Sequence, residues 1–119
     1  MAAMGQVKRS ERVSGLVHRI LSTIIEHDLW DQRVKNVTLT GVEVSRDLKH
    51  ANVYVSVLGD DDETVAAIKA LKGATSFLRL RLGEEIKLRY TPELHFRYDS
   101  SIVDGMRMDK LLAELNGNT

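Results

Sequence analysis

A run of small residues at positions 73–76 most constrains the fold of this chain, because apolar residues recur with helical spacing on both sides of it. Before the run they recur at three-residue steps from Val65 to Leu71, and from the run onward at four-residue steps from Ala74 to Leu82. Each pattern is typical of a helix with one apolar stripe. Glycine costs about 1 kcal/mol relative to alanine inside a helix, and threonine and serine are also weak helix formers. The sequence therefore predicts two helical segments that meet at a bend.

Three consecutive aspartates at positions 60–62 precede the first segment. Aspartate accepts hydrogen bonds from the free N–H groups of a helix start and interacts favourably with the positive end of the helix dipole. We therefore interpret this run as a helix cap rather than as a magnesium site.

The bend is also a candidate binding site, since small side chains let another backbone come close. Three basic residues surround it, namely Lys72, Arg79 and Arg81. Such an arrangement is suited to hold a phosphate backbone. The alternative is an ordinary helix–turn–helix that packs on a sheet and has no binding role.

The strongest helical pattern lies nearer the N-terminus, where apolar residues from Val13 to Ile24 follow a three–four rhythm. It predicts a helix over residues 12–27, with Ser10 as its cap. We expect residues 1–9 to form a flexible basic segment.

Basic residues lie at or before this predicted helix start, namely Lys8, Arg9 and Arg12. Positive charge there opposes the helix dipole, so local helix energetics do not explain it. These residues are suited to contact an anionic partner, although a solubilising tail would have a similar composition.

Two alternating stretches predict an antiparallel hairpin, because only a short turn at 45–49 separates them. Residues 37–44 alternate with a change of phase at Gly41, where a β-bulge would restore a single buried face. Residues 51–57 alternate without interruption. Between the first helix and this hairpin, Trp30 lies in a polar connection, and we expect it to plug the edge of the core.

A third strand is predicted at residues 94–98, after Pro92, because proline is tolerated at a strand start. It follows a helix and can join the sheet by a crossover connection. A cap at 99–101 and apolar residues up to Leu115 predict a short C-terminal helix. The expected fold is α+β, with the order helix, strand, strand, bent helix pair, strand.

The length of 119 residues favours one domain, which we place at 10–116, with a tail at 117–119. Lysine plus arginine equals aspartate plus glutamate, but basic residues dominate before residue 20 and between 69 and 97. The chain has no cysteine, which excludes disulfides and thiolate metal sites. No apolar run is long enough to cross a membrane, and we expect a cytoplasmic protein.

No motif indicates catalysis or a cofactor. The chain has neither a phosphate-binding loop followed by Lys-Ser/Thr nor a Gly-x-Ser-x-Gly elbow. The four histidines, at 18, 27, 50 and 95, are scattered with no pair at metal-ligand spacing. We therefore expect surface or edge histidines, no metal, no cofactor and no enzymatic activity.

Several blocks of sequence, in order, resemble the ribosome-binding factor A family. The resemblance extends over about residues 10–115 and rests on the blocks at 41–48, 51–55, 74–79, 92–101 and 105–108. It implies a type II KH-like fold and an accessory factor, not a nuclease. Such a factor binds the immature small ribosomal subunit and its rRNA. It assists late rRNA maturation, including end processing, and supports growth in the cold.

One departure from the family lies at the bend. The family has an Ala-x-Gly kink between its helices, whereas this chain has Ala74-Thr75-Ser76, with serine in place of the glycine. Gly73 can supply the flexibility instead. The resemblance and the basic residues together predict an rRNA-binding surface made of Lys8, Arg9, Arg12, Lys72, Gly73, Ala74, Thr75, Ser76, Arg79 and Arg81.

We expect the free protein to be a monomer, with the small subunit and other assembly factors as its partners. The alternative function is a protein–protein interaction module that makes no direct RNA contact. In that case an exposed sheet edge or the final helix would dock a protein, and the basic residues would only be solvated.

Overall fold

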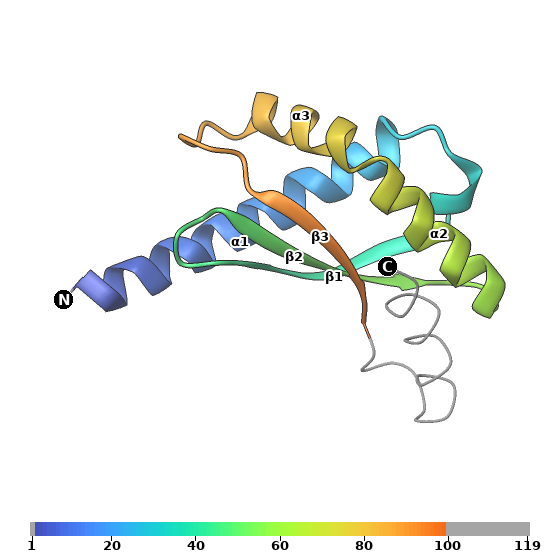
Figure 1. Ribbon diagram of the computed structural model, residues 1–119, viewed down its shortest axis with the longest axis horizontal. Coiled ribbons are helices and arrows are strands. Elements are labelled where there is room, and N and C mark those ends of the chain that lie inside the picture. Colours follow the sequence, from blue (N-terminus) through green and yellow to red (C-terminus); the bar gives the residue numbers. More distant parts are fainter. Residues whose placement is uncertain (1, 100–119) are drawn as a thin grey trace.

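Three helices pack on a three-stranded sheet (Figure 1). This computed structural model describes the backbone of residues 2–99 and the side chains of residues 9–99. The elements are, in order, α1 (Ala2–His27), a short 3-10 helix η1 (Gln32–Val34), β1 (Val37–Val44), β2 (His50–Val57), α2 (Asp61–Gly73), α3 (Thr75–Glu85) and β3 (Glu93–Tyr98). The predicted α+β class and element order are confirmed. The predicted C-terminal helix lies outside the described residues.

The sheet has the order β1-β2-β3, with β1 antiparallel and β3 parallel to β2. Leu39 pairs with Val55 and Gly41 pairs with Tyr54, so Thr40 is skipped in the register of the strand pair. This is the predicted bulge. It keeps Leu39 and Val44 on the same buried face although they are five positions apart, an odd number that would put them on opposite faces of a regular strand.

The connection from β2 to β3 runs through both α2 and α3, which is the predicted crossover. Alternate residues of β2, from Ala51 to Val55, are fully buried, and Leu94 and Phe96 of β3 are almost fully buried. They face the helices, whose Leu21, Leu71, Leu78 and Leu82 belong to the same core cluster.

Helix α1 begins at Ala2, ten residues before the predicted start. Ser10 is therefore not a cap. It lies inside the helix, where it is buried and its main-chain oxygen accepts a hydrogen bond from Ser14 Oγ. The apolar stripe begins only at Val13, but alanine, methionine, glutamine, lysine and arginine are good helix formers and extend the helix beyond it. The domain boundaries at residues 9 and 116 stay predictions.

The capping function of the aspartate run is confirmed at Asp60. Its carboxylate accepts the N–H of Glu63 at 2.8 Å, and the Glu63 carboxylate accepts the N–H of Asp60 at 3.3 Å. The two contacts form a capping box. At its other end α2 meets α3 across a single residue, Ala74, with φ −93° and ψ 5°.

The prediction for Trp30 is wrong, since this residue is 94% exposed. Asp31 caps η1 immediately afterwards, and Val34 of η1 is the residue that enters the core. Leu29, next to the tryptophan, is partly buried against the core. Two smaller apolar residues therefore close this edge, and the indole is left in solvent.

None of the helices in the described part of the chain is both long and apolar enough to cross a membrane.

Candidate nucleic-acid interface

One end of the molecule gathers positive charge from four separate segments. The first turns of α1, the β1–β2 turn, the side of α3 that carries Arg79 and the connection from α3 to β3 provide these segments, and the α1 start, the turn and the connection lie at the same end in Figure 1. Two open pockets of ≈ 320 and ≈ 200 Å³ lie there, and they share Lys49 and Tyr90 among their lining residues. We call their basic residues the basic end: Arg9, Lys49, Arg79 and Arg89.

The β1–β2 turn holds Lys49 in place. The Asp47 carboxylate accepts Ser45 Oγ at 2.6 Å and the main-chain N–H of Lys49 at 3.0 Å. The hydroxyl of Ser45 is the main reason why the pKa of Asp47 lies below its ordinary value. Leu48, at φ 62°, is the only non-glycine residue with positive φ in the described chain. The turn is thus well defined, and it presents Lys49 and Arg46 as exposed side chains.

Arg79 ties α3 to the segment before β3. Its Nε and Nη2 donate to the main-chain oxygen of Thr91 at 3.2 and 2.8 Å. The side chain remains exposed, so the guanidinium has further N–H groups for another acceptor. In the same segment, the guanidinium of Arg89 lies 5.6 Å from the centre of the Tyr90 ring, a cation–π contact.

Arg81 differs from Arg79 in its contacts. It donates to Asp28 Oδ2 at 2.9 Å and to Glu84 Oε1 at 2.7 Å, and Glu85 lies 3.8 Å away. Hydrogen bonds to Glu84 and Asp28 raise the pKa of Arg81 above its ordinary value. Residues two positions apart on a helix differ by about 200° in direction. Arg81 thus fastens α3 to the end of α1, and the carboxylates around it make it less suited to bind phosphate than Arg79.

The bend between α2 and α3 is open to solvent. Gly73 and Ser76 are exposed, and a Cβ placed on Gly73 would meet nothing within 4 Å. The N–H of Ala74 donates to Ala70 O at 3.0 Å and Thr75 Oγ1 donates to Lys72 O at 2.8 Å, so the bend is well ordered. No described glycine has positive φ, so the expected special role of Gly73 as a flexible joint is not needed for the bend.

The predicted site residues therefore divide into groups. Ser76 and Arg79 are three residues apart in α3 and share one side of it, which joins the bend to the basic end. Arg9 and Arg12, one helical turn apart in α1, are exposed, and so is Lys72 at the end of α2. The side chain of Lys8 lies outside the described ones. Sequence reasoning missed Lys49 and Arg89. The available signals were the two basic residues in the predicted turn at 45–49 and the excess of basic residues between 69 and 97.

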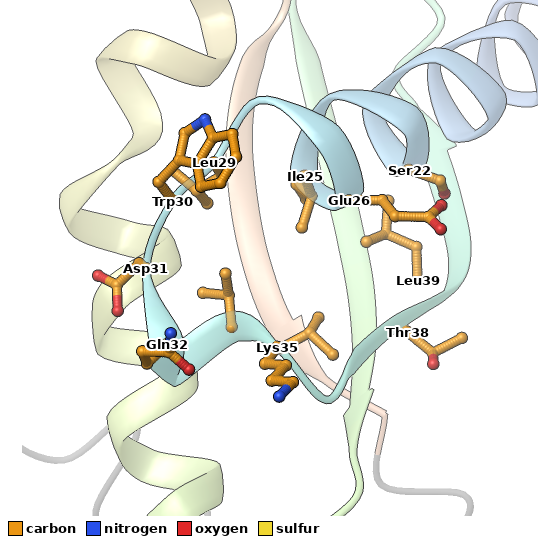
Figure 2. Close-up of a pocket in the computed structure, with 12 residues that line it drawn as sticks. Ser22, Ile25, Glu26, Leu29, Trp30, Asp31, Gln32, Lys35, Thr38 and Leu39 are labelled. Carbon is orange, nitrogen blue, oxygen red and sulfur yellow. The ribbon is translucent and has the colours of Figure 1, made fainter.

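A second surface lies at the other end of α1. An open pocket of ≈ 560 Å³ is formed by the last turns of α1, the connection to β1 and the start of β1. Figure 2 shows Trp30 and Asp31 on one side of this pocket and Glu26 and Thr38 on the other. Both signs of charge line it. Asp31 also accepts two hydrogen bonds from the Arg33 guanidinium, at 3.0 and 2.7 Å, which lowers its pKa from 3.8 to about 2.

The expectation of scattered histidines is wrong for His50 and His95. His50 begins β2 and His95 lies in β3, and the parallel pairing brings His50 Nδ1 to 3.1 Å from His95 Nε2. The carboxylate of Glu93 is 3.3 Å from the same His50 nitrogen. Forty-five residues of sequence separation concealed this cluster. His18, by contrast, has a structural contact, because its Nε2 lies 3.0 Å from Leu39 O.

Comparison with known proteins gives one consistent result. The family model for ribosome-binding factor A matches residues 9–112. The ribosome-binding factor A of Geobacter sulfurreducens is 42% identical over 107 residues, which are 90% of this chain and 91% of the relative. That of Pseudomonas fluorescens strain SBW25 is 41% identical over 109 residues, which are 90% of this chain and 83% of the relative.

The solved structures that resemble this fold are also ribosome-binding factor A proteins. The crystal structure of ribosome-binding factor A from Thermus thermophilus has a TM-score of 0.67 at 26% identity, covering 75% of this chain and 94% of that one. A model of the Thermus thermophilus factor fitted into a cryo-EM map of a 30S complex has a TM-score of 0.63 at 26% identity, covering 76% and 94%. The solution structure of a ribosome-binding factor A homologue from Thermotoga maritima has a TM-score of 0.69 at 30% identity, covering 82% and 92%.

Proposed function

Because this chain belongs to the ribosome-binding factor A family, we propose that it binds the immature small ribosomal subunit through rRNA and acts as a non-catalytic assembly factor. The relative fitted into a 30S complex supports the choice of the small subunit as the partner. Assistance in late rRNA maturation, including end processing, and support of growth in the cold are parts of the same proposal. So are its monomeric free state, its cytoplasmic location and its cooperation with other assembly factors.

The basic end is the observation that carries the proposal of direct RNA contact. Arg9, Lys49, Arg79 and Arg89 come from four segments that the fold brings to two adjoining pockets. The net charge of the chain is zero, so this gathering is a property of the fold and not of the composition. A local positive surface attracts a phosphate backbone even when the whole protein is neutral.

The bend extends this surface along α3. Ser76 lies one helical turn before Arg79, and no side chain caps the start of α3. The first N–H groups of a helix and its positive dipole end favour an anion. We assign the phosphate contacts to Arg9, Arg12, Lys49, Lys72, Arg79 and Arg89, with close approach at residues 73–76. Lys8 stays in the proposed set, and Arg81 is its weakest member.

Binding of this kind depends on shape and charge more than on base sequence. Contacts to phosphates determine position and affinity but carry no direct sequence information. Tyr90, 60% exposed and lining both pockets, offers an aromatic ring at the basic end that a base could stack on. Specificity would then come from the folded form of the immature subunit.

A salt titration with charge-reversal variants tests this proposal. We expect binding to immature small subunits to weaken steeply as salt rises, because bound phosphates release counterions. Lys49→Glu or Arg79→Glu should weaken binding and lower the salt slope by about 1 for each phosphate that the protein no longer neutralises. Arg19→Glu is the matched control, since Arg19 is exposed in α1 and lines neither of the two pockets.

Equal retention of all three variants on sedimented subunits would remove the basic end as the binding surface. If binding were also insensitive to salt, an apolar protein contact would replace RNA contact. Incubation of the purified protein with precursor rRNA should leave the RNA intact, and cleavage by the protein alone would overturn the non-catalytic part of the proposal.

Trp30 supports a second candidate function, a protein–protein contact. Tryptophan is enriched among the residues that dominate binding energy at protein interfaces. This one is 94% exposed beside a pocket of ≈ 560 Å³. Trp30→Ala should then lower affinity for whole subunits, which contain protein, but not for protein-free rRNA. Loss of affinity for both would argue against a protein partner at this site.

A further inference from the structure

We propose that His50, Glu93 and His95 form a binding site for a divalent transition-metal ion of the zinc class. His50 lies at the start of β2, and the other two residues lie in β3. Each offers one ligand atom, and the three atoms all lie within 4.8 Å of one another. This inference does not depend on RNA binding.

The distances suit a metal in the middle of the cluster. Zinc bonds of about 2.0–2.2 Å at tetrahedral angles place neighbouring ligand atoms about 3.4 Å apart. His50 Nδ1 lies 3.1 Å from His95 Nε2 and 3.3 Å from Glu93 Oε2. Small side-chain rotations would therefore complete the geometry, and the backbone need not move.

Hydrogen bonding engages these three groups only in pairs. His50 Nδ1 lies between Glu93 Oε2 and His95 Nε2, and an imidazole nitrogen carries either one proton or one lone pair. With a proton it can donate to either neighbour, and with a lone pair it can accept only from a protonated His95 Nε2. A cation at the centre interacts favourably with all three lone pairs at once.

The sheet holds the ligands together. In the parallel register, His50 pairs with Glu93 and Asn52 pairs with His95, so all three ligands project from the face of the sheet opposite the buried residues Ala51 and Leu94. The rings of His50 and His95 are stacked, with centres 5.3 Å apart. The side chains of His50 and Glu93 are 52% and 57% exposed, which gives an ion direct access.

The ligand set selects the class of metal. Two imidazoles and one carboxylate suit zinc, copper and nickel, whereas magnesium and calcium prefer oxygen ligands alone. Three protein ligands leave a fourth position for water. Because the ligands come from two strands, a bound ion would also clamp β2 to β3 near the start of their pairing.

Titration of the metal-free protein with Zn²⁺, followed by calorimetry, tests the site. We expect one saturable site, a rise in melting temperature with Zn²⁺, and no displacement by excess Mg²⁺. Loss of a group that merely supports a metal ligand lowers affinity roughly 10–100-fold, so His50→Ala or His95→Ala should lower it by at least about 100-fold. His27→Ala is the matched control, since His27 is an exposed histidine at the end of α1.

Co²⁺ provides a second readout, because its visible spectrum reports the number and type of ligands. Wild type and His27→Ala should show the same bands, and both ligand variants should lose them. Circular dichroism of each variant checks that it is folded; if His50→Ala is not, His95→Gln tests the same ligand set. The absence of saturable Zn²⁺ binding, or an equal loss of affinity in His27→Ala, would overturn the proposal.

Discussion

Arg79 and Arg81 show how two identical side chains, two residues apart, come to differ in role. Arg79 contacts a main-chain oxygen and remains exposed at the basic end, whereas Arg81 is held by carboxylates from the α1–β1 connection and α3. An anion can approach the first guanidinium without displacing a partner of opposite charge. The second is already neutralised by its neighbours.

Substitution of the two arginines should therefore affect different properties of the protein: its stability for Arg81 and its subunit binding for Arg79. We expect Arg81→Gln to lower the melting temperature, because Arg81 makes partly buried ion pairs with Asp28 and Glu84, and to leave affinity for immature subunits nearly unchanged. Arg79→Gln should weaken subunit binding and reduce its salt slope by about 1. Thermal unfolding and sedimentation of both variants check this. A larger loss of subunit binding in Arg81→Gln than in Arg79→Gln would indicate that Arg81 contacts RNA.

Asp31 gives a pH-dependent contribution at the start of η1. Its pKa is lowered from 3.8 to about 2, mainly by hydrogen bonds from the Arg33 guanidinium. A carboxyl whose pKa falls on folding stabilises the folded state above the unfolded pKa, and this contribution is lost as the pH drops toward the folded pKa. Asp31→Asn should thus lower stability at neutral pH, and the difference from wild type should vanish between pH 3.8 and about 2. Urea unfolding of both proteins at several pH values measures this difference in stability.

At the scale of elements, the joint between α2 and α3 is a place where one substitution can raise the stability of the protein and weaken its RNA binding. Gly73 is the last residue of α2, its φ is not positive, and a Cβ there would meet no atom within 4 Å. Gly73→Ala should therefore stabilise the protein by about 0.5–1 kcal/mol, through helix propensity and reduced freedom of the unfolded chain. Chemical denaturation measures this gain.

The same variant tests whether RNA needs the open backbone at the bend. If a phosphate approaches closely at residue 73, Gly73→Ala should weaken subunit binding despite its higher stability. Asp60→Ala is a contrasting change in the same helix, since losing the capping box should cost about 1 kcal/mol. It should leave subunit binding of the folded protein unchanged. Unchanged binding in Gly73→Ala would remove the bend from the proposed contacts.

At the scale of the whole molecule, one core connects all the layers. Leu78 of α3 is fully buried in the same cluster as residues from α1, α2 and all three strands. Leu78→Ala should lower the free energy of unfolding by about 2–5 kcal/mol, because it removes buried methyl groups and leaves a cavity. A single core also predicts one cooperative transition, so fluorescence and circular dichroism should report the same midpoint. Two separate transitions would contradict this.

Local patterns in the sequence determined most elements of this protein. Apolar spacing and the aspartate cap predicted α2 and α3, and the phase change at Gly41 predicted the bulge in β1, because these features depend on neighbours in the chain. The start of α1 was missed, since helix propensity without an apolar stripe leaves no periodic signal there. The blocks of family resemblance could be recognised for the same reason: they are local strings of residues.

Only the tertiary structure decided which distant side chains meet. The crossover brings His95 to His50, and the folding of four segments to one end joins Lys49 and Arg89 to Arg9 and Arg79. It also pairs Arg81 with Asp28, 53 residues away, and leaves Trp30 in solvent. Charges and ligands act over a few ångströms of space, and separation along a chain does not determine that distance. The elements could therefore be predicted from sequence, whereas the surfaces they build could not.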